Sequence, residues 1–174
     1  MPQSGLLSDK PTEQTVDICE LVQEVFRQLQ DMADSRGVAL KMATDSIVVH
    51  LDTGALELIL INLVANAVKY SDRAKPDRHV TIESVDALEH YEVRVKDNGI
   101  GIPAELLPSV FERFVRAHPE LDGELGIEGT GLGLAIAEEC VKSLGGVIEV
   151  ESTEGTGTTF TVRIPKKLPP LAEA

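Results

Sequence analysis

The chain has 174 residues, 43% of them hydrophobic, so it is long enough to bury one core and is expected to form a single domain. With 16 Lys and Arg against 29 Asp and Glu, its formal charge is -13, which excludes nucleic acid and anionic membrane surfaces as partners. No apolar run reaches the ~18 residues that cross a bilayer, and the N-terminus lacks a signal-peptide pattern. Cys19 and Cys140 lie far apart in predicted helices, which predicts reduced thiols in a cytoplasmic domain.

The first part of the chain predicts a tail, a helix and a strand pair. Residues 1–14 are rich in Pro, Ser and charge, as in a tail or a linker from an upstream dimerisation domain. Apolar residues recur with helical period over residues 16–36, and Gly37 supplies a stop. Segments 38–43 and 47–51 then predict the two strands of a hairpin.

A second helix carries a polar stripe opposite its apolar side. Asp52 or Thr53 is expected to cap this helix, which should end near Ser71. Polar and aromatic residues recur at helical spacing on one stripe, formed by Asn62, Asn66, Lys69 and Tyr70. Two amides and an ammonium in one stripe indicate either a solvated helix face or a polar ligand in front of the helix.

The middle of the chain predicts two strands and a long loop. A loop at 72–78 precedes strands at 79–85 and 91–96, which pair around an acidic turn. A short helix at 104–114 has Pro before it, and residues 115–131 form a glycine-rich loop of a length that is usually functional or disordered.

The chain closes with a helix and a hairpin. Helical period resumes over residues 132–144, and segments 147–152 and 158–164 predict the hairpin. Residues 167–174 form a C-terminal tail, which leaves a domain at 15–166. Helices and mostly hairpin-connected strands predict the α+β class, with one mixed, mostly antiparallel sheet and helices packed on one face.

Glycine-rich stretches at 97–101, 126–133 and 155–157 mark places where the backbone comes close to another group. Residues 129–133 lead directly into a helix, whose N-terminal N–H groups and dipole favour a phosphate. A flexible hinge before a helix uses the same residue types, so this motif alone leaves both interpretations open.

Asp97 also has two interpretations. Asp followed by Asn-Gly most often caps a turn. A carboxylate at the end of a strand is also an acceptor for an exocyclic amine such as adenine N6, with Gly99 and Gly101 keeping side chains out of the base pocket.

Three further positions have a structural and a chemical interpretation. Asn66 either bonds its neighbours or offers a hard amide oxygen to Mg²⁺. Lys69 is either an exposed lysine or a phosphate ligand. Arg113 and Arg116 are either solvated, or one of them neutralises charge on a transferring phosphoryl group.

Five motifs in order resemble a known family: NLVANAVKY, DNGIGIP, FERFVR, GTGLGLAI and EGTGTTFTVRIP. They are similar to the N, G1, F, G2 and G3 boxes of the catalytic, ATP-binding domain of bacterial sensor histidine kinases. That domain belongs to the wider gyrase, chaperone, histidine kinase and mismatch-repair ATPase superfamily. The resemblance covers residues 16–165 and implies a Bergerat-type α/β sandwich, with ATP and Mg²⁺ as cofactors.

The resemblance implies a catalytic set around the phosphates. It implies that Asn62 and Asn66 lie by the phosphates, that Asn66 binds Mg²⁺, and that Lys69 touches phosphate. Arg116 would approach the γ-phosphate.

The resemblance also implies the rest of the nucleotide site. Tyr70 would lie against the nucleoside, Asp97 would bind adenine N6, and residues 129–133 would form the hinge of a lid. The remaining implied contacts are Gly99, Gly101, Ile102, Phe114, Gly129, Thr130, Gly131, Leu132, Gly133 and Thr158.

Three features depart from the family's pattern. Val115 stands where many relatives have an aromatic residue, which removes a ribose contact. The lid at 119–128 is acidic, so we expect it to bind no triphosphate through its side chains and to be poorly ordered without ligand. None of the four histidines is followed by the phosphoacceptor pattern of the family: His50, His79, His90 and His118.

Three functions are compatible with these motifs. The first transfers the γ-phosphoryl group of Mg-ATP to a histidine on a separate dimerisation domain of the same kinase. A response regulator would then be an indirect partner, and the isolated domain is expected to be a monomer. The second is an ATP-hydrolysing clamp, which in the relatives uses a Glu four residues before the Mg-binding Asn. Asn62 occupies that position and cannot act as a general base, which favours the first function. The third is a nucleotide-binding module without transfer.

Overall fold

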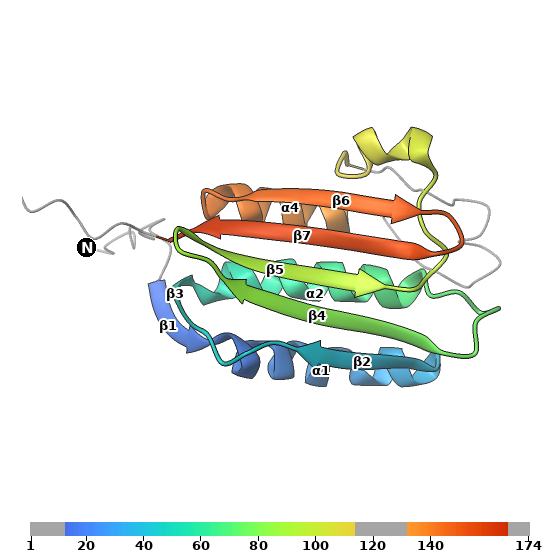
Figure 1. The fold of residues 1–174 in the computed structure, drawn as a ribbon, viewed down its shortest axis with the longest axis horizontal. Coiled ribbons are helices and arrows are strands. Elements are labelled where there is room, and N and C mark those ends of the chain that lie inside the picture. Colours follow the sequence, from blue (N-terminus) through green and yellow to red (C-terminus); the bar gives the residue numbers. More distant parts are fainter. Residues whose placement is uncertain (1–12, 114–131, 167–174) are drawn as a thin grey trace, which may run out of the picture.

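A five-stranded sheet forms the main layer of the structure, a computed structural model that describes residues 13–113 and 132–166. The strand order is β2-β4-β5-β7-β6 (Figure 1). β2 and β4 run parallel and the other neighbours antiparallel, which confirms a mixed, mostly antiparallel sheet. The strands are β2 (Val38–Ala43), β4 (Arg78–Asp86), β5 (His90–Asp97), β6 (Val147–Thr153) and β7 (Gly157–Pro165).

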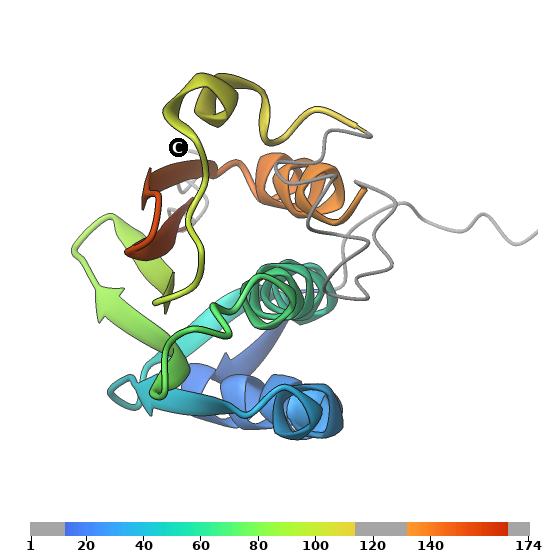
Figure 2. The ribbon, with the colours of Figure 1, turned by 90° about the vertical axis from the view of Figure 1, so that its right-hand side faces the viewer.

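Three α-helices in the described residues cover one face of this sheet, and Figure 2 shows them side by side. They are α1 (Ile18–Ser35), α2 (Thr53–Lys69) and α4 (Gly133–Ser143). The arrangement confirms the α+β class with helices packed on one face. No helix within these residues is long and apolar enough to cross a membrane.

Capping side chains set where the first two helices begin. Asp17 accepts a hydrogen bond from the Cys19 backbone N–H at 2.8 Å, so α1 begins at Ile18 and not at the predicted Val16. Asp52 caps α2 in the same way, accepting from a backbone N–H three residues on at 3.1 Å. Of the two predicted caps for α2, the structure therefore uses Asp52.

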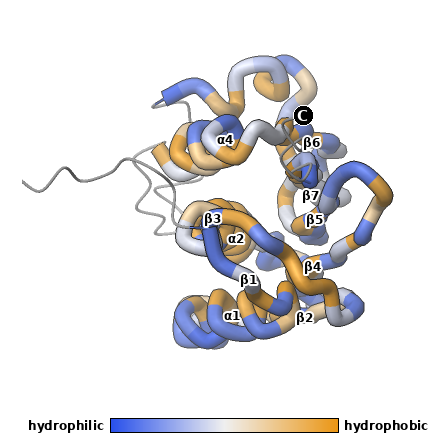
Figure 3. The backbone as a smooth tube through the Cα atoms, turned by 90° about the vertical axis from the view of Figure 1, so that its left-hand side faces the viewer, coloured by the Kyte–Doolittle hydropathy of each residue, from blue (hydrophilic) through white to orange (hydrophobic). Residues whose placement is uncertain are grey.

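The core lies between the sheet and the helices. Ile82, Val95 and Phe160 lie opposite one another on β4, β5 and β7, and each is at most 1% exposed. Figure 3 shows apolar residues concentrated along α2 and the strands that it covers. Alternate residues of the same strands point to the other face, where Arg94 and Arg163 both bind Glu92, at 2.8 and 3.1 Å.

The hairpin predicted between residues 38 and 51 is wrong. β3 (Val48–Asp52) pairs antiparallel with β1 (Glu13–Asp17) in a separate two-stranded sheet, while β2 pairs with β4. The start of α1 holds the segment between β2 and β3, because the Ile18 N–H donates to the Ile47 carbonyl at 2.8 Å. The chain therefore passes from one sheet to the other without turning back on itself.

Two boundaries also differ from prediction. Glu13 and Gln14 lie in β1, although the N-terminal tail was predicted to reach residue 14. The helix predicted at 104–114 is the shorter 3-10 helix η1 (Ala104–Ser109). Pro108 lies inside it and has no N–H with which to continue an α-helical ladder.

Replacing Phe160 by Ala tests the core. The ring is 0% exposed and lies edge-on to Phe111, with centroids 6.0 Å apart. Its removal should lower the free energy of unfolding in urea by about 3 to 5 kcal/mol, because a cavity replaces it. Leu88→Ala is the control, because this side chain is 92% exposed and its loss should change stability by less than about 0.5 kcal/mol. Equal losses in the two variants would contradict this description of the core.

Candidate functional site

Three segments meet where β5 ends: the C-terminal end of α2, the loop after β5 and the turn between β6 and β7. The Ile100 N–H donates to the Tyr70 carbonyl at 3.0 Å, and the Ile100 carbonyl accepts from the Gly155 N–H at 2.8 Å. The loop is thus bonded on both sides. These bonds bring the predicted residues of α2, of the β5 loop and of β7 into one corner of the fold.

Gly99 and Gly101 permit this close packing. A Cβ at Gly99 would lie 2.3 Å from the Tyr70 carbonyl oxygen. Gly101 has a φ of +76°, and its Cβ would lie 2.3 Å from the Thr153 carbonyl oxygen. Both glycines therefore have backbone contacts that exclude a side chain. Their predicted contact with a base stays a prediction.

The Asp97 side chain is half-buried at this corner. Its Oδ1 accepts hydrogen bonds from the Gly99 N–H at 2.9 Å and the Thr158 N–H at 3.3 Å. Oδ2 accepts none from the described residues. Burial raises the pKa of Asp97 to about 6, against the opposing effect of the two hydrogen bonds and of the Lys75 charge. One carboxylate oxygen thus caps the turn while the other remains an acceptor.

Ser152 fastens two predicted residues of the site to each other. Its hydroxyl donates its one hydrogen to the Gly157 carbonyl at 3.0 Å. The hydroxyl oxygen is therefore the acceptor for both the Ile102 N–H and the Thr158 hydroxyl, each at 2.8 Å. Thr158 is only 7% exposed. The Thr158 hydroxyl is therefore already bonded inside the protein.

The polar stripe of α2 runs from this corner towards α4. Its half-buried residues are Asn62, Asn66, Lys69 and Tyr70. Asn62 lies about 12 Å along the helix axis from Tyr70. The Asn62 Nδ2 donates to the Leu58 carbonyl at 2.8 Å, and its Oδ1 lies 3.2 Å from where a Cβ on Gly133 would be. The stripe therefore ends beside the N-terminus of α4.

The N-terminus of α4 has the features of an anion site. The N-cap residue is Leu132, whose side chain makes no capping hydrogen bond. The N–H groups of the first turn thus depend on other acceptors, and the helix dipole favours a negative one. Gly133 lies next to Asn62 of the stripe, whereas the predicted contacts of Leu132 and Gly133 with phosphate stay predictions.

Other predicted site residues lie outside the described residues. They are Phe114, Arg116, Gly129, Thr130 and Gly131, together with Val115 and the acidic lid at 119–128. Arg113 pairs with Glu139 of α4 at 2.5 Å in an exposed ion pair, which fits its solvated interpretation.

Lys75 belongs to this corner, although no sequence signal singled it out. Its Nζ donates to the carbonyls of Asn98 at 2.8 Å and Gly99 at 3.4 Å in the β5 loop, and of Thr156 at 3.1 Å in the β6–β7 turn. The loop at 72–78 also contains two arginines, so composition does not distinguish this lysine from other loop cations.

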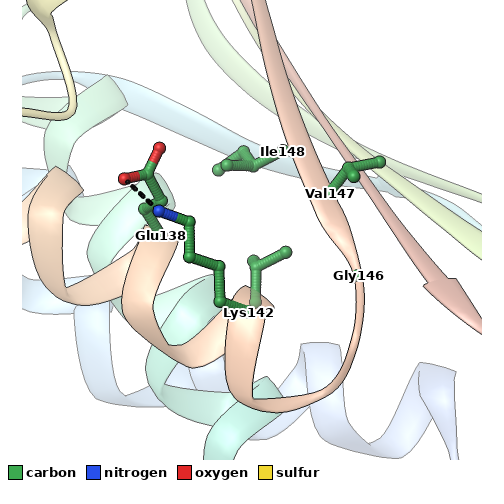
Figure 4. A pocket seen from close by; sticks show the side chains of 6 residues that line it. Glu138, Lys142, Gly146, Val147 and Ile148 are labelled. Atoms are coloured by element: carbon green, nitrogen blue, oxygen red, sulfur yellow. Dashed lines mark hydrogen bonds and ion pairs between the residues drawn. The ribbon is translucent and has the colours of Figure 1, made fainter.

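A separate pocket of about 150 Å³ lies between the end of α4 and the start of β6 (Figure 4). Glu138 and Lys142 form an ion pair at 3.2 Å on one side, and the aliphatic Val147 and Ile148 lie on the other. It contains none of the predicted site residues, and it is smaller than the ~300 Å³ at which ligand pockets usually start. We therefore assign no nucleotide to it.

Residues 51–168 match a family described as histidine kinase-, DNA gyrase B- and HSP90-like ATPase. The chain belongs to this family. The match includes α2, the β5 loop, α4 and the β6–β7 turn, which are the segments that form the site. The superfamily predicted from the order of the motifs is thereby confirmed.

Sensor histidine kinases are among the relatives of this domain. WalK of Bacillus subtilis (strain 168) is 44% identical over 122 residues, which cover 68% of this chain and 19% of WalK. The catalytic domain of the histidine kinase ThkA has a TM-score of 0.72 and 28% identity, covering 88% of this chain and 97% of that one. Full-length ShkA in complex with AMPPNP has a TM-score of 0.76 and 25% identity, covering 92% of this chain and 33% of ShkA.

This domain therefore resembles the ATPase domains of sensor histidine kinases. It spans about a fifth of the length of WalK. A ThkA structure in complex with the response regulator protein TrrA is also similar, with a TM-score of 0.69 and 26% identity, covering 89% of this chain and 42% of that one. The predicted fold and the predicted family are confirmed.

Replacing Asp97 by Asn should stabilise the nucleotide-free domain at neutral pH. Because folding raises the pKa of Asp97 to about 6, the protonated form of this side chain favours the folded state. This stabilisation is fully present below the pKa of Asp97 in the unfolded chain and is lost as pH rises through about 6. Asn keeps an oxygen for the Gly99 and Thr158 N–H groups without the charge. Calorimetry should show a melting temperature about 2 to 4 °C above wild type at about pH 8 and no gain at about pH 4. A lower melting temperature at pH 8 would contradict the effect of burial.

Proposed function

We propose that this domain binds Mg-ATP and transfers the γ-phosphoryl group to a histidine on a separate dimerisation domain. The observation that carries this proposal is the Asp97 carboxylate, which is half-buried and fixed through Oδ1 by two backbone N–H groups. Its Oδ2 accepts no hydrogen bond from the described residues, so it suits an exocyclic amine such as adenine N6.

The phosphates would lie along α2, between Tyr70 and the N-terminus of α4. Asn62, Asn66 and Lys69 share that stripe, and the first turn of α4 adds backbone N–H groups. The similarity to ShkA in complex with AMPPNP supports a nucleotide in this fold.

Asn66 would hold Mg²⁺. Residues 13–113 and 132–166 contain no group of three His, Cys, Asp or Glu that could hold a metal ion. Mg²⁺ is commonly held by one or two protein oxygens together with substrate phosphates and water, so a single amide oxygen fits that role. The ion would neutralise developing phosphate charge.

Asn62 favours transfer over hydrolysis. Its Nδ2 is engaged by the Leu58 carbonyl at 2.8 Å, and an amide cannot remove a proton from water. The domain would thus position the triphosphate and neutralise its charge, while the nucleophilic imidazole comes from the partner domain. The similarity to ThkA in complex with TrrA supports a response regulator as the later acceptor.

Asp97→Asn should abolish ATP binding, because an amide can turn a donor towards the adenine amine. Isothermal titration calorimetry at neutral pH measures the loss, and the raised melting temperature predicted above shows that the variant is folded. Unchanged affinity would disprove the adenine assignment.

Arg116→Ala should leave ADP binding largely intact and slow phosphoryl transfer by about 10²-fold or more, because the arginine would act on the γ-phosphoryl group. Transfer is followed with radiolabelled ATP and a supplied histidine-bearing dimerisation domain. Arg113→Ala is the matched control, since that arginine pairs with Glu139. Equal losses of ADP binding and transfer would argue against a γ-phosphate role.

The same transfer assay tests the function as a whole. An acid-labile, base-stable phosphoryl product on the dimerisation domain is expected. ATP binding without such a product would indicate a nucleotide-binding module, and release of phosphate at the same rate without the acceptor would indicate an ATPase.

A further inference from the structure

Lys75 bonds the two loops that border Asp97. An ammonium has three donors, and Nζ lies within hydrogen-bonding distance of three backbone carbonyls, at 2.8, 3.1 and 3.4 Å. Asn98 and Gly99 directly follow Asp97 on β5, whereas Thr156 precedes β7, whose Thr158 N–H binds the Asp97 carboxylate. Both segments that donate to Asp97 are therefore fastened to one cation.

The lysine itself is held in place from both sides. Its backbone N–H donates to the Asp72 carbonyl at 3.1 Å, and its carbonyl accepts from the Arg78 Nε at 3.0 Å. Its side chain is 28% exposed. Asn98 is fixed as well, because its Oδ1 accepts from the His79 N–H at 3.0 Å. The contact thus joins segments that are already ordered.

Charged groups of both signs surround this contact, and they include the Arg78 guanidinium, whose Nε binds the Lys75 carbonyl. Asp72 lies 4.0 Å from the Lys75 ammonium, and Asp97 experiences the field of that ammonium, which lowers its pKa against the effect of burial. α2 contributes Lys69 in its last turn, and the β6–β7 turn contributes the exposed Glu154.

We propose that Lys75 is a positioning residue of the nucleotide site, which fixes the Asp97 carboxylate for the adenine amine by joining the β5 loop to the β6–β7 turn. The inference rests on the proposed function, because it assumes that Asp97 receives the base. In this role Lys75 acts through backbone carbonyls and through its charge, and it needs no direct contact with the nucleotide.

Three variants test this role: Lys75→Met, Lys75→Arg, and Lys142→Met as a charge-matched control on an exposed lysine of α4. Lys75→Met should weaken ATP binding about tenfold at neutral pH, since it removes hydrogen bonds from a charged donor. Lys75→Arg keeps the charge and should recover part of the affinity. Lys142→Met should bind as wild type does.

The pH dependence separates positioning from general loosening. ATP affinity should be lost as pH falls through the pKa of Asp97, which is about 6 in the wild type. Carbon-13 NMR of the Asp97 carboxyl in the nucleotide-free domain should show this pKa higher by about half a unit or more in Lys75→Met and unchanged in Lys142→Met. Lys75→Arg should titrate near wild type.

The outcomes distinguish the two proposals. If wild type binds ATP but Lys75→Met matches Lys142→Met in affinity and in the Asp97 titration, the role of Lys75 is disproved and the proposed function stands. If the wild type binds no ATP, both proposals fall. If Lys75→Met unfolds, Lys75→Arg decides. An ATP affinity between those of wild type and Asp97→Asn supports the positioning role, and an affinity equal to that of wild type contradicts it.

Discussion

The fixation of the loop after β5 is the constraint on which the rest of the site depends. A backbone segment bonded to α2 on one side and to the β6–β7 turn on the other leaves no room for side chains at Gly99 and Gly101. The same packing withdraws Asp97 from water and raises its pKa to about 6. The domain thus holds a carboxylate where burial disfavours its charge, and carboxylates of this kind are typical of binding and catalytic sites.

The fold of the sheet and helices could be predicted from local patterns. Helical period located α1 and α2, a predicted cap located the start of α2, and strand patterns located the central strands, because the buried side follows directly from the spacing of apolar residues. The pairing of β3 with β1 could not be predicted in this way. Both candidate partners of β3 are short strands, and the choice depends on the Ile18–Ile47 contact between segments distant in sequence.

The site was predictable in part for a similar reason. Asn62 and Asp97 stand in motifs whose order identifies a family, whereas Lys75 lies in a loop without periodicity. Its role arises from three carbonyls in two other segments, and a carbonyl carries no sequence signal. Ser152 was missed because its hydroxyl likewise bonds to backbone groups and to Thr158.

The start of β1 and the end of β7 both lie at the end of the fold opposite the end of β5 (Figure 1). Glu13 pairs with Asp52 at the start of α2, and the Lys166 N–H donates to Glu89 in the turn before β5. β5 has 8 residues, about 26 Å of strand, between that end and the corner that holds Asp97. A partner domain joined through β1 would attach to this domain at the end opposite Asp97. A small rotation at that attachment would move the corner that holds Asp97 through a larger distance than the residues near β1.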